Sequence, residues 1–347
     1  MSASCPYRFV LEIRAFEGGQ VLHRHTLSPD WEPAVEAARL AGLRQHGVWH
    51  EPRPGEPSLL PLWHEAAGQP LVHGVRVQMA RDGCAWHADV HAGYFGDAAR
   101  DVVAACVAAG QLTAEDRVRY AVMAYAVEPS RTEGAALRFT AADKPQGLHV
   151  RDRAFADLVA RSAPCGDADA TDVDVVVPER VLDEMCALTR AAGERETGGV
   201  LLGHVCRDAA RADVGVEVTA QVPARHTVGD AVKLTFTSDT WTDVRAAVAL
   251  RRADELLLGW WHSHPAHAWC KACPVERQRV CHLATGFLSA EDRALHRAMF
   301  PWAYTQALVV THSAAGLETK LFGWRHGALH ERGFRAHPVS LNTIEAT

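Results

Sequence analysis

The segment 256–265, LLLGWWHSHP, decides the fold of the C-terminal half of this 347-residue chain. It is apolar on both faces, which is typical of a strand buried on both sides within an α/β sheet. The run ends in His262 and His264. Residues i and i+2 of a strand point to the same face, about 6–7 Å apart at Cα, so both imidazoles can reach one ion. The alternative is a strand end with two surface histidines, in a chain that has 20.

The flanking sequence predicts a compact mixed α/β domain over residues 172–347. The segments with strand character are VDVVV (173–177), GGVLLGHV (198–205), VGVEVTAQV (214–222), KLTFT (233–237), TQALVVTH (305–312) and TKLFGWRH (319–326). A helix is expected after Pro178, with an apolar stripe through Val181 and Met185 and an end at Gly193. Two more helices are expected, one capped by Thr237 or Ser238 and one over residues 289–300.

The N-terminal half predicts a separate α+β domain over residues 1–145. Apolar and charged residues alternate over residues 8–14, and Gly18-Gly19 then turns the chain into a second strand. A helix is expected from about Asp30 to Gly47, and Asp82-Gly83 marks a second hairpin. Residues 146–171 lack periodicity and are rich in small and acidic side chains, so they predict a linker between the domains.

Composition limits the partners. The net charge of −6 argues against nucleic acid as the main partner. The sequence has no apolar run of about 18 residues and no signal-peptide pattern at its start, so we expect no membrane span and a cytoplasmic location. The Ala- and Arg-rich composition is typical of bacterial proteins from GC-rich genomes.

Three further residues complete a candidate catalytic centre. Two imidazoles and the carboxylate of Asp292 suit Zn²⁺ and leave the fourth tetrahedral position for water. Asp292 has a competing role, because Ser289-Ala-Glu-Asp before an apolar helix is close to a capping box. Glu196 could accept a proton from the attacking water, although most glutamates in loops are simply exposed.

A second metal site is predicted in the segment between the histidines and Ser289. Cys270 and Cys273 form a Cys-x-x-Cys pair that can bind one ion, and Cys281 and His282 would complete a tetrahedron. His267 is the rival for the fourth position. This set predicts a structural Zn²⁺ that orders a loop without a core, against the alternative of a cysteine-bearing loop with no metal.

The order of these motifs resembles the JAMM (MPN+) metalloprotease family. ETGGVLLG, then HSHP, then S-x-x-D carry the resemblance over residues 172–335, with all five signature positions present. It implies that Glu196 is the general acid/base, that His262, His264 and Asp292 bind the catalytic zinc, and that Ser289 helps to hold the oxyanion. One departure is the 23-residue segment 266–288, which is longer than the family's short spacing.

The resemblance also implies an activity. JAMM enzymes hydrolyse isopeptide or peptide bonds after the C-terminal glycine of ubiquitin or ubiquitin-like proteins. The chain looks similar to the peptidase of bacterial ubiquitin-like conjugation operons, some of them antiviral, in which activating and conjugating enzymes are further partners. The alternatives are an amidohydrolase for small peptides or metabolites and a non-catalytic scaffold, which the intact signature disfavours. Trp260, Trp261, Trp269 and Phe287 could shape a groove for the modifier's tail, with a position in the core as the alternative for Trp260 and Trp261.

Overall fold

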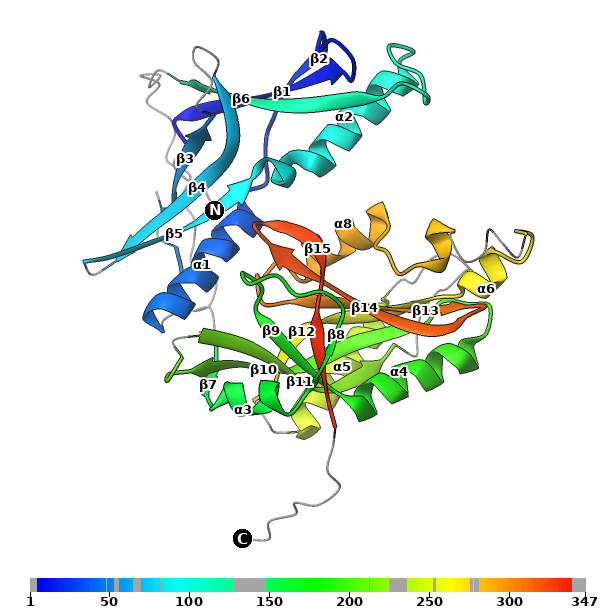
Figure 1. The fold of residues 1–347 in the computed structure, drawn as a ribbon. Coiled ribbons are helices and arrows are strands. Elements are labelled where there is room, and N and C mark those ends of the chain that lie inside the picture. Colours follow the sequence, from blue (N-terminus) through cyan, green and yellow to red (C-terminus); the bar gives the residue numbers. More distant parts are fainter. Residues whose placement is uncertain are drawn as a thin grey trace, which may run out of the picture. The chain divides into compact units, whose positions relative to one another are not determined.

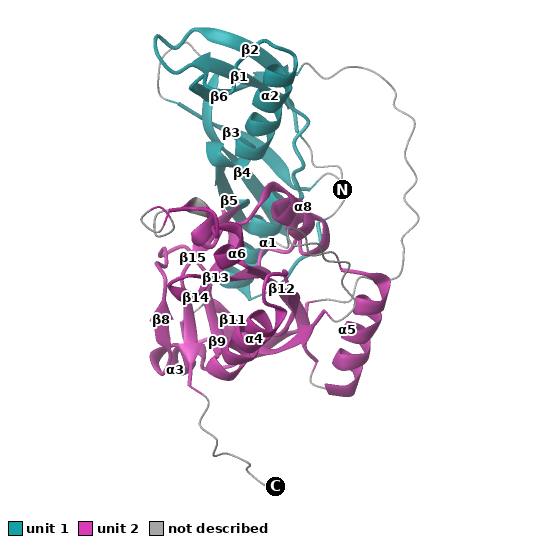
Figure 2. Cartoon of the chain, turned by 90° about the vertical axis from the view of Figure 1, so that its right-hand side faces the viewer, with its two compact units in different colours: residues 1–147, 326–328 teal, residues 148–325, 329–347 magenta. Residues whose placement is uncertain are grey.

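The computed structural model describes residues 5–47, 49–52, 56–64, 70–81, 83–127, 148–211, 213–224, 236–251, 254–274, 277 and 281–338. The chain divides into two compact units (Figure 2). Unit 1 comprises residues 1–147 and 326–328, and unit 2 comprises residues 148–325 and 329–347. Both units combine sheets with helices, which confirms the predicted mixed α/β class.

Unit 1 contains an antiparallel sheet of order β2-β1-β6-β4-β3, with β5 paired to β4 (Figure 1). Its elements are β1 (Tyr7–Ala15), β2 (Val21–Thr26), α1 (Glu32–His46), β3 (Ser58–Trp63), β4 (Leu71–Arg81), β5 (Cys84–His91), η1 (Ala92–Phe95), α2 (Gly96–Ala108) and β6 (Val118–Ala126). Both predicted hairpins are present, and α1 ends at Gly47 in the left-handed conformation that glycine favours. The sheet and helices share one apolar core that includes Leu11 and Ile13.

Unit 2 contains a sheet of order β15-β14-β13-β12-β10-β11-β9-β16-β8, with β7 paired to β10 (Figure 1). Its strands are β7 (Val150–Asp152), β8 (Ala163–Cys165), β9 (Asp174–Pro178), β10 (Gly198–Asp208), β11 (Asp213–Pro223), β12 (Leu256–His264), β13 (Gln306–Ser313), β14 (Gly316–Arg325), β15 (Ala328–Arg332) and β16 (Phe334–His337). Its helices are α3 (Phe155–Ala160), α4 (Glu179–Ala192), α5 (Ser238–Arg251), α6 (Ala266–Trp269), η2 (His282–Ala284) and α8 (Ala290–Met299). Most of the predicted strand 233–237 lies outside the described residues.

Strand β12 lies inside this sheet, antiparallel to β10 and parallel to β13. Its last seven residues are buried, as the apolar run 256–265 predicted. Gly259 allows the close approach to β13, because a Cβ at this position would come within 1.8 Å of the Gln306 carbonyl oxygen. The two neighbouring strands therefore fix the path of the segment that carries the histidines.

Residues 148–165 differ from the predicted linker of 146–171. The structure has β7, α3 and β8 here, and β7 and β8 pair with β10 and β16 in the sheet of unit 2. Phe155 and Leu158 of α3 are buried against Val176 and Cys206. Strands of three residues are too short to show a detectable alternation of apolar and polar residues, and tertiary contacts hold them in place. Among the described residues, every helix is too short or too polar to cross a membrane.

Candidate active site

His262 and His264 lie at the C-terminal end of β12 and point to the same face, as their spacing predicted. The two Nε2 atoms are 3.0 Å apart, and both side chains are almost completely buried. Trp269 and Phe287 contact the ring of His264, with ring centroids 5.0 Å and 4.6 Å away. The imidazoles are therefore held close together by packing from several segments. The alternative of two surface histidines is wrong.

Asp292 approaches the histidines from the first turn of α8. Its Oδ2 atom lies 3.5 Å from Nε2 of His262. The predicted capping box is also present, since the Ser289 N–H donates to Asp292 Oδ2 at 2.8 Å and the Asp292 N–H donates to Ser289 Oγ at 3.1 Å. Asp292 therefore has both roles at once, because the hydrogen bonds of the cap fix the position of the carboxylate that faces His262. Ser289 Oγ accepts from the cap, so its O–H remains available as a donor.

These donors fit a tetrahedral zinc ion. Zinc–nitrogen bonds of about 2.0–2.1 Å place neighbouring donor atoms about 3.3 Å apart. The donor atoms of His262, His264 and Asp292 all lie within 4.8 Å of one another. Burial, with the neighbouring His262, lowers the pKa of His264 to about 3, which leaves a neutral imidazole. Burial works to raise the pKa of Asp292, but His262 and the Ser289 hydrogen bonds outweigh it and hold the pKa below its usual range.

Glu196 lies two residues before the start of β10, the strand that pairs with β12. Gly198 is paired with His262, and Ser263 exchanges hydrogen bonds of 2.7 Å and 3.0 Å with Thr197. The paired register ends at Gly198 and His262, and continuing it by two residues would set Glu196 opposite His264. Opposed residues on antiparallel strands share a face of the sheet. Glu196 is partly buried, and a continued register predicts that it shares the face of the donor set.

The sequence interpretation missed a buried contact behind His262. The Trp260 ring is stacked on His262 at a centroid distance of 4.5 Å, and its Nε1–H donates to Nδ1 of His296 at 3.1 Å. Nε2 of His296 lies 3.4 Å from the Thr305 hydroxyl. His296 follows Asp292 by one helical turn, so the same face of α8 contributes both side chains. This i, i+4 spacing was the available signal. Trp260 and Trp261 belong to the core, since neither is exposed.

Replacing His296 by phenylalanine is expected to lower the free energy of unfolding by about 1–3 kcal/mol, because the buried Trp260 N–H loses its acceptor. Burial lowers the pKa of His296 to about 3, so between that pH and about 6.5 only the unfolded chain takes up this proton. The wild type should therefore lose more stability than His296→Phe as the pH falls from about 7 to about 5. Urea unfolding at both pH values measures this, and equal losses would contradict it. His296→Gln, which keeps an acceptor, is the control.

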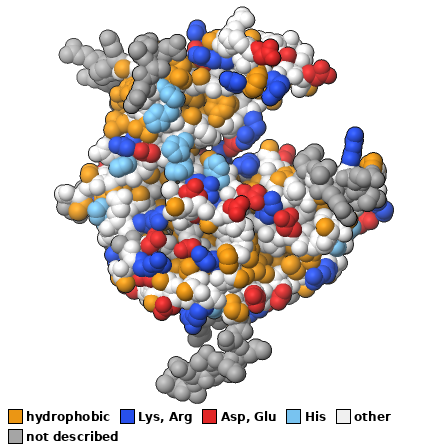
Figure 3. All heavy atoms as spheres, in the orientation of Figure 1, with side chains coloured by type: hydrophobic (Ala, Val, Ile, Leu, Met, Phe, Trp, Pro, Cys, Tyr) orange, Lys and Arg blue, Asp and Glu red, His pale blue; other side chains and the backbone are white. Residues whose placement is uncertain are grey.

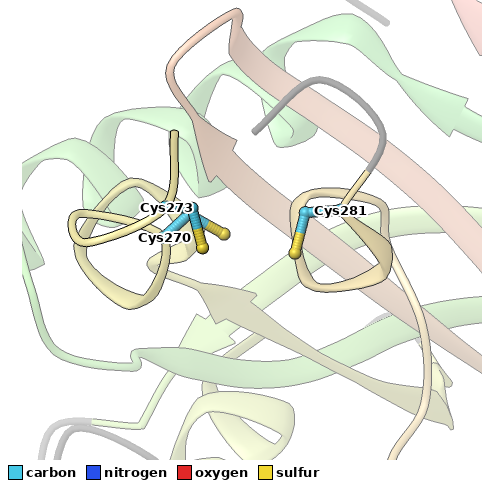
Figure 4. A group of neighbouring side chains, drawn as sticks. All are labelled: Cys270, Cys273 and Cys281. Atoms are coloured by element: carbon cyan, nitrogen blue, oxygen red, sulfur yellow. The ribbon is translucent and has the colours of Figure 1, made fainter. Parts of the chain in front are cut away.

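The predicted cysteines also come together. Cys270 and Cys273 lie on one arm of the segment 266–288 and Cys281 on the other (Figure 4), with all three sulfur atoms within 4.8 Å of one another. All nine cysteines of the chain are in described residues, and all are thiols. The side chain of His282 lies outside the described residues. Nδ1 of the rival, His267, is 3.1 Å from the His312 carbonyl oxygen.

Comparison with known proteins identifies a similar family for part of unit 2. Residues 178–269 match the family of prokaryotic homologs of the JAB domain, a range that includes Glu196 and both histidines but ends before Ser289. Curated proteins gave no match. Solved structures similar to this chain include the solution structure of protein DSY2949 from Desulfitobacterium hafniense, with 20% identity, coverage of 49% of this chain and 95% of that chain, and a TM-score of 0.32, too low to support an inference. Residues 178–269 of unit 2 are therefore similar to the JAB domain of the prokaryotic family, in agreement with the predicted resemblance to JAMM/MPN+ proteins.

Proposed function

We propose that this protein is a zinc-dependent isopeptidase or peptidase that cleaves after the C-terminal glycine of a ubiquitin-like protein. The observation that carries the proposal is the convergence of His262, His264 and Asp292 within 4.8 Å, from a strand and a helix that are far apart in the sequence. Two imidazoles and one carboxylate are donors that suit a catalytic zinc site, which keeps one position open. A non-catalytic scaffold has no need of this buried donor set.

The chain's own residues supply the proton transfers. Zinc bound here would lower the pKa of a water molecule and polarise the scissile carbonyl. Glu196, which a continued register of β10 and β12 would set on the same face, accepts the proton of the attacking water and then delivers it to the leaving amine. The Ser289 hydroxyl, positioned by its cap with Asp292, donates to the oxyanion that develops on the carbonyl oxygen. The products are a free C-terminal glycine carboxylate and an amine.

The substrate is proposed to be a folded modifier that unit 1 helps to recruit. Six of the eight exposed large apolar side chains among the described residues lie on unit 1, namely Leu22, Leu60, Trp63, Tyr120, Tyr125 and Val127. Exposed aromatic and aliphatic side chains favour protein partners. Acidic and basic side chains are interspersed over the face of the molecule that Figure 3 shows, and a surface of mixed sign favours protein partners over nucleic acid. We propose a bacterial ubiquitin-like conjugation pathway, with an antiviral role, as the setting.

The wild type is expected to cleave a ubiquitin-like protein fused through its C-terminal glycine to a reporter, and to lose this activity after chelation and regain it with zinc. Recruitment by unit 1 predicts that Trp63→Ser raises KM for the folded fusion and leaves KM unchanged for a peptide of the tail alone. Equal turnover of the tail peptide and the fusion by the wild type would instead indicate an amidohydrolase. Failure to cleave either substrate with zinc bound would reject the enzyme.

A further inference from the structure

The insertion 266–288 joins the end of β12 to the cap of α8, and its three cysteines form a second donor cluster that shares no residue with the group of His262, His264 and Asp292. We propose that Cys270, Cys273 and Cys281 bind a structural zinc ion that clips this insertion shut and so holds the catalytic residues at its two ends. The evidence for this metal site is independent of the proposed function. Only its effect on catalysis rests on the proposed function.

The geometry of the sulfur atoms matches a thiolate site. Zinc–sulfur bonds of about 2.3 Å place neighbouring sulfurs about 3.8 Å apart, and the three sulfurs lie within 4.8 Å of one another. The turn of the Cys-x-x-Cys pair is closed by the Cys273 N–H, which donates to the Cys270 carbonyl at 2.9 Å. Backbone N–H groups of Leu283 and Ala284 donate to the sulfur of Cys281. Donors aimed at sulfur stabilise a thiolate, which is the form that binds metal.

The insertion has little apolar packing of its own. Among its described residues, only Ala266, Cys270, Gly286 and Leu288 are buried. A segment without a core needs another source of order, and a bound metal supplies it when the donors are far apart in the chain. Cys281 is separated from Cys273 by seven residues, so an ion shared by them closes a loop. A disulfide would use two of these thiols and leave the third without a role.

The clip lies next to the catalytic histidine on both arms of the insertion. Trp269 precedes Cys270 directly and contacts the ring of His264 at 5.0 Å. Phe287, on the returning arm, contacts the same ring at 4.6 Å. Phe287 is followed two residues later by Ser289, the cap of α8. An ion that ties the two arms together therefore holds both walls around His264 and the start of the helix that carries the third donor.

Zinc counting on the full chain tests the site. Purified wild type should contain two zinc ions per chain, and Cys273→Ser and Cys281→Ser should each contain one. Cys165→Ser, a partly exposed cysteine outside the insertion, is the matched control and should retain two. After reconstitution with Co²⁺, the wild type should show thiolate-to-cobalt charge-transfer absorption in the near ultraviolet, and Cys273→Ser should lose most of it. An unchanged zinc count in both variants, or a disulfide between these cysteines in the native chain, would overturn the site.

Two further measurements test the clip. Trypsin should cut Cys281→Ser faster than the wild type at the exposed Lys271 and Arg277. The affinity of the remaining catalytic zinc should fall on the order of 10- to 100-fold, as for the loss of supporting groups around a metal ligand. Equal trypsin cleavage and equal affinity would overturn the clip. A wild type that binds two zinc ions but cleaves no fusion would reject the proposed function alone, whereas one that cleaves with a single zinc would reject the second site alone.

Discussion

The Glu196→Gln variant is expected to cleave a ubiquitin-like fusion on the order of 10³-fold more slowly than the wild type, with an unchanged zinc content. Glutamine has nearly the same shape as glutamate but cannot take a proton from water. Glu196 is separate from the donors His262, His264 and Asp292, so its loss leaves them intact. Steady-state kcat/KM and zinc content of the same preparation measure both parts of the prediction.

Glu194→Gln is the matched control. Glu194 lies two residues earlier in the same loop, is exposed and pairs with Lys271 at 3.5 Å. Its replacement should leave kcat/KM within about twofold of the wild type, since an exposed ion pair contributes little. Full activity in Glu196→Gln would reject the assignment of the base. Loss of zinc in that variant would mean that Glu196 is a ligand.

The second large effect is expected at Asp292, where the cap and the metal site can be separated. Asp292→Asn keeps a side-chain oxygen that accepts from the Ser289 N–H, so α8 keeps its cap. The neutral amide is a poor zinc ligand, so the variant should lose the catalytic zinc and all measurable cleavage. Its free energy of unfolding in chelator should stay close to that of the wild type. Atomic emission and chemical denaturation measure the two quantities.

Ser289→Ala supplies the converse case. It removes the hydroxyl that accepts from the Asp292 N–H, so it should cost about 1 kcal/mol of stability and retain the catalytic zinc. Its kcat should fall on the order of 10²- to 10³-fold, because the oxyanion loses a donor. If Asp292→Asn bound zinc as tightly as the wild type, the carboxylate would have only a capping role.

The predictable part of the fold was the part with long, strong patterns. The apolar run 256–265 correctly predicted a strand, because a strand buried on both faces has a continuous run of apolar residues. The apolar stripe through Val181 and Met185 correctly predicted α4, because a helix buried on one face has apolar residues every three or four positions. The region 148–165 was predicted as a linker, because β7 and β8 have three residues each. Such strands are stabilised by pairing with strands that are distant in the sequence, so the local sequence pattern does not predict them.

The grouping of His262, His264 and Asp292 was predicted from the sequence, but not the contacts that support it. The spacing of His262 and His264 determines their common face whatever surrounds them. Their approach to Asp292 depends on how α8 packs, which the sequence alone does not give. His296 was missed because a buried histidine and an exposed one look the same in a sequence. Only its position one turn after Asp292 hinted at its contact with Trp260.

Because His262 and His264 are buried inside the sheet, the stability of the folded chain should depend on the concentration of zinc. A chain unfolded at β12 separates these imidazoles from Asp292, so zinc at this site would bind the native state alone. Each tenfold rise in free zinc above the dissociation constant then adds about 1.4 kcal/mol to the free energy of unfolding. The melting temperature of the protein should rise with zinc concentration. When zinc is scarce, both the stability of the folded chain and the proposed activity would fall.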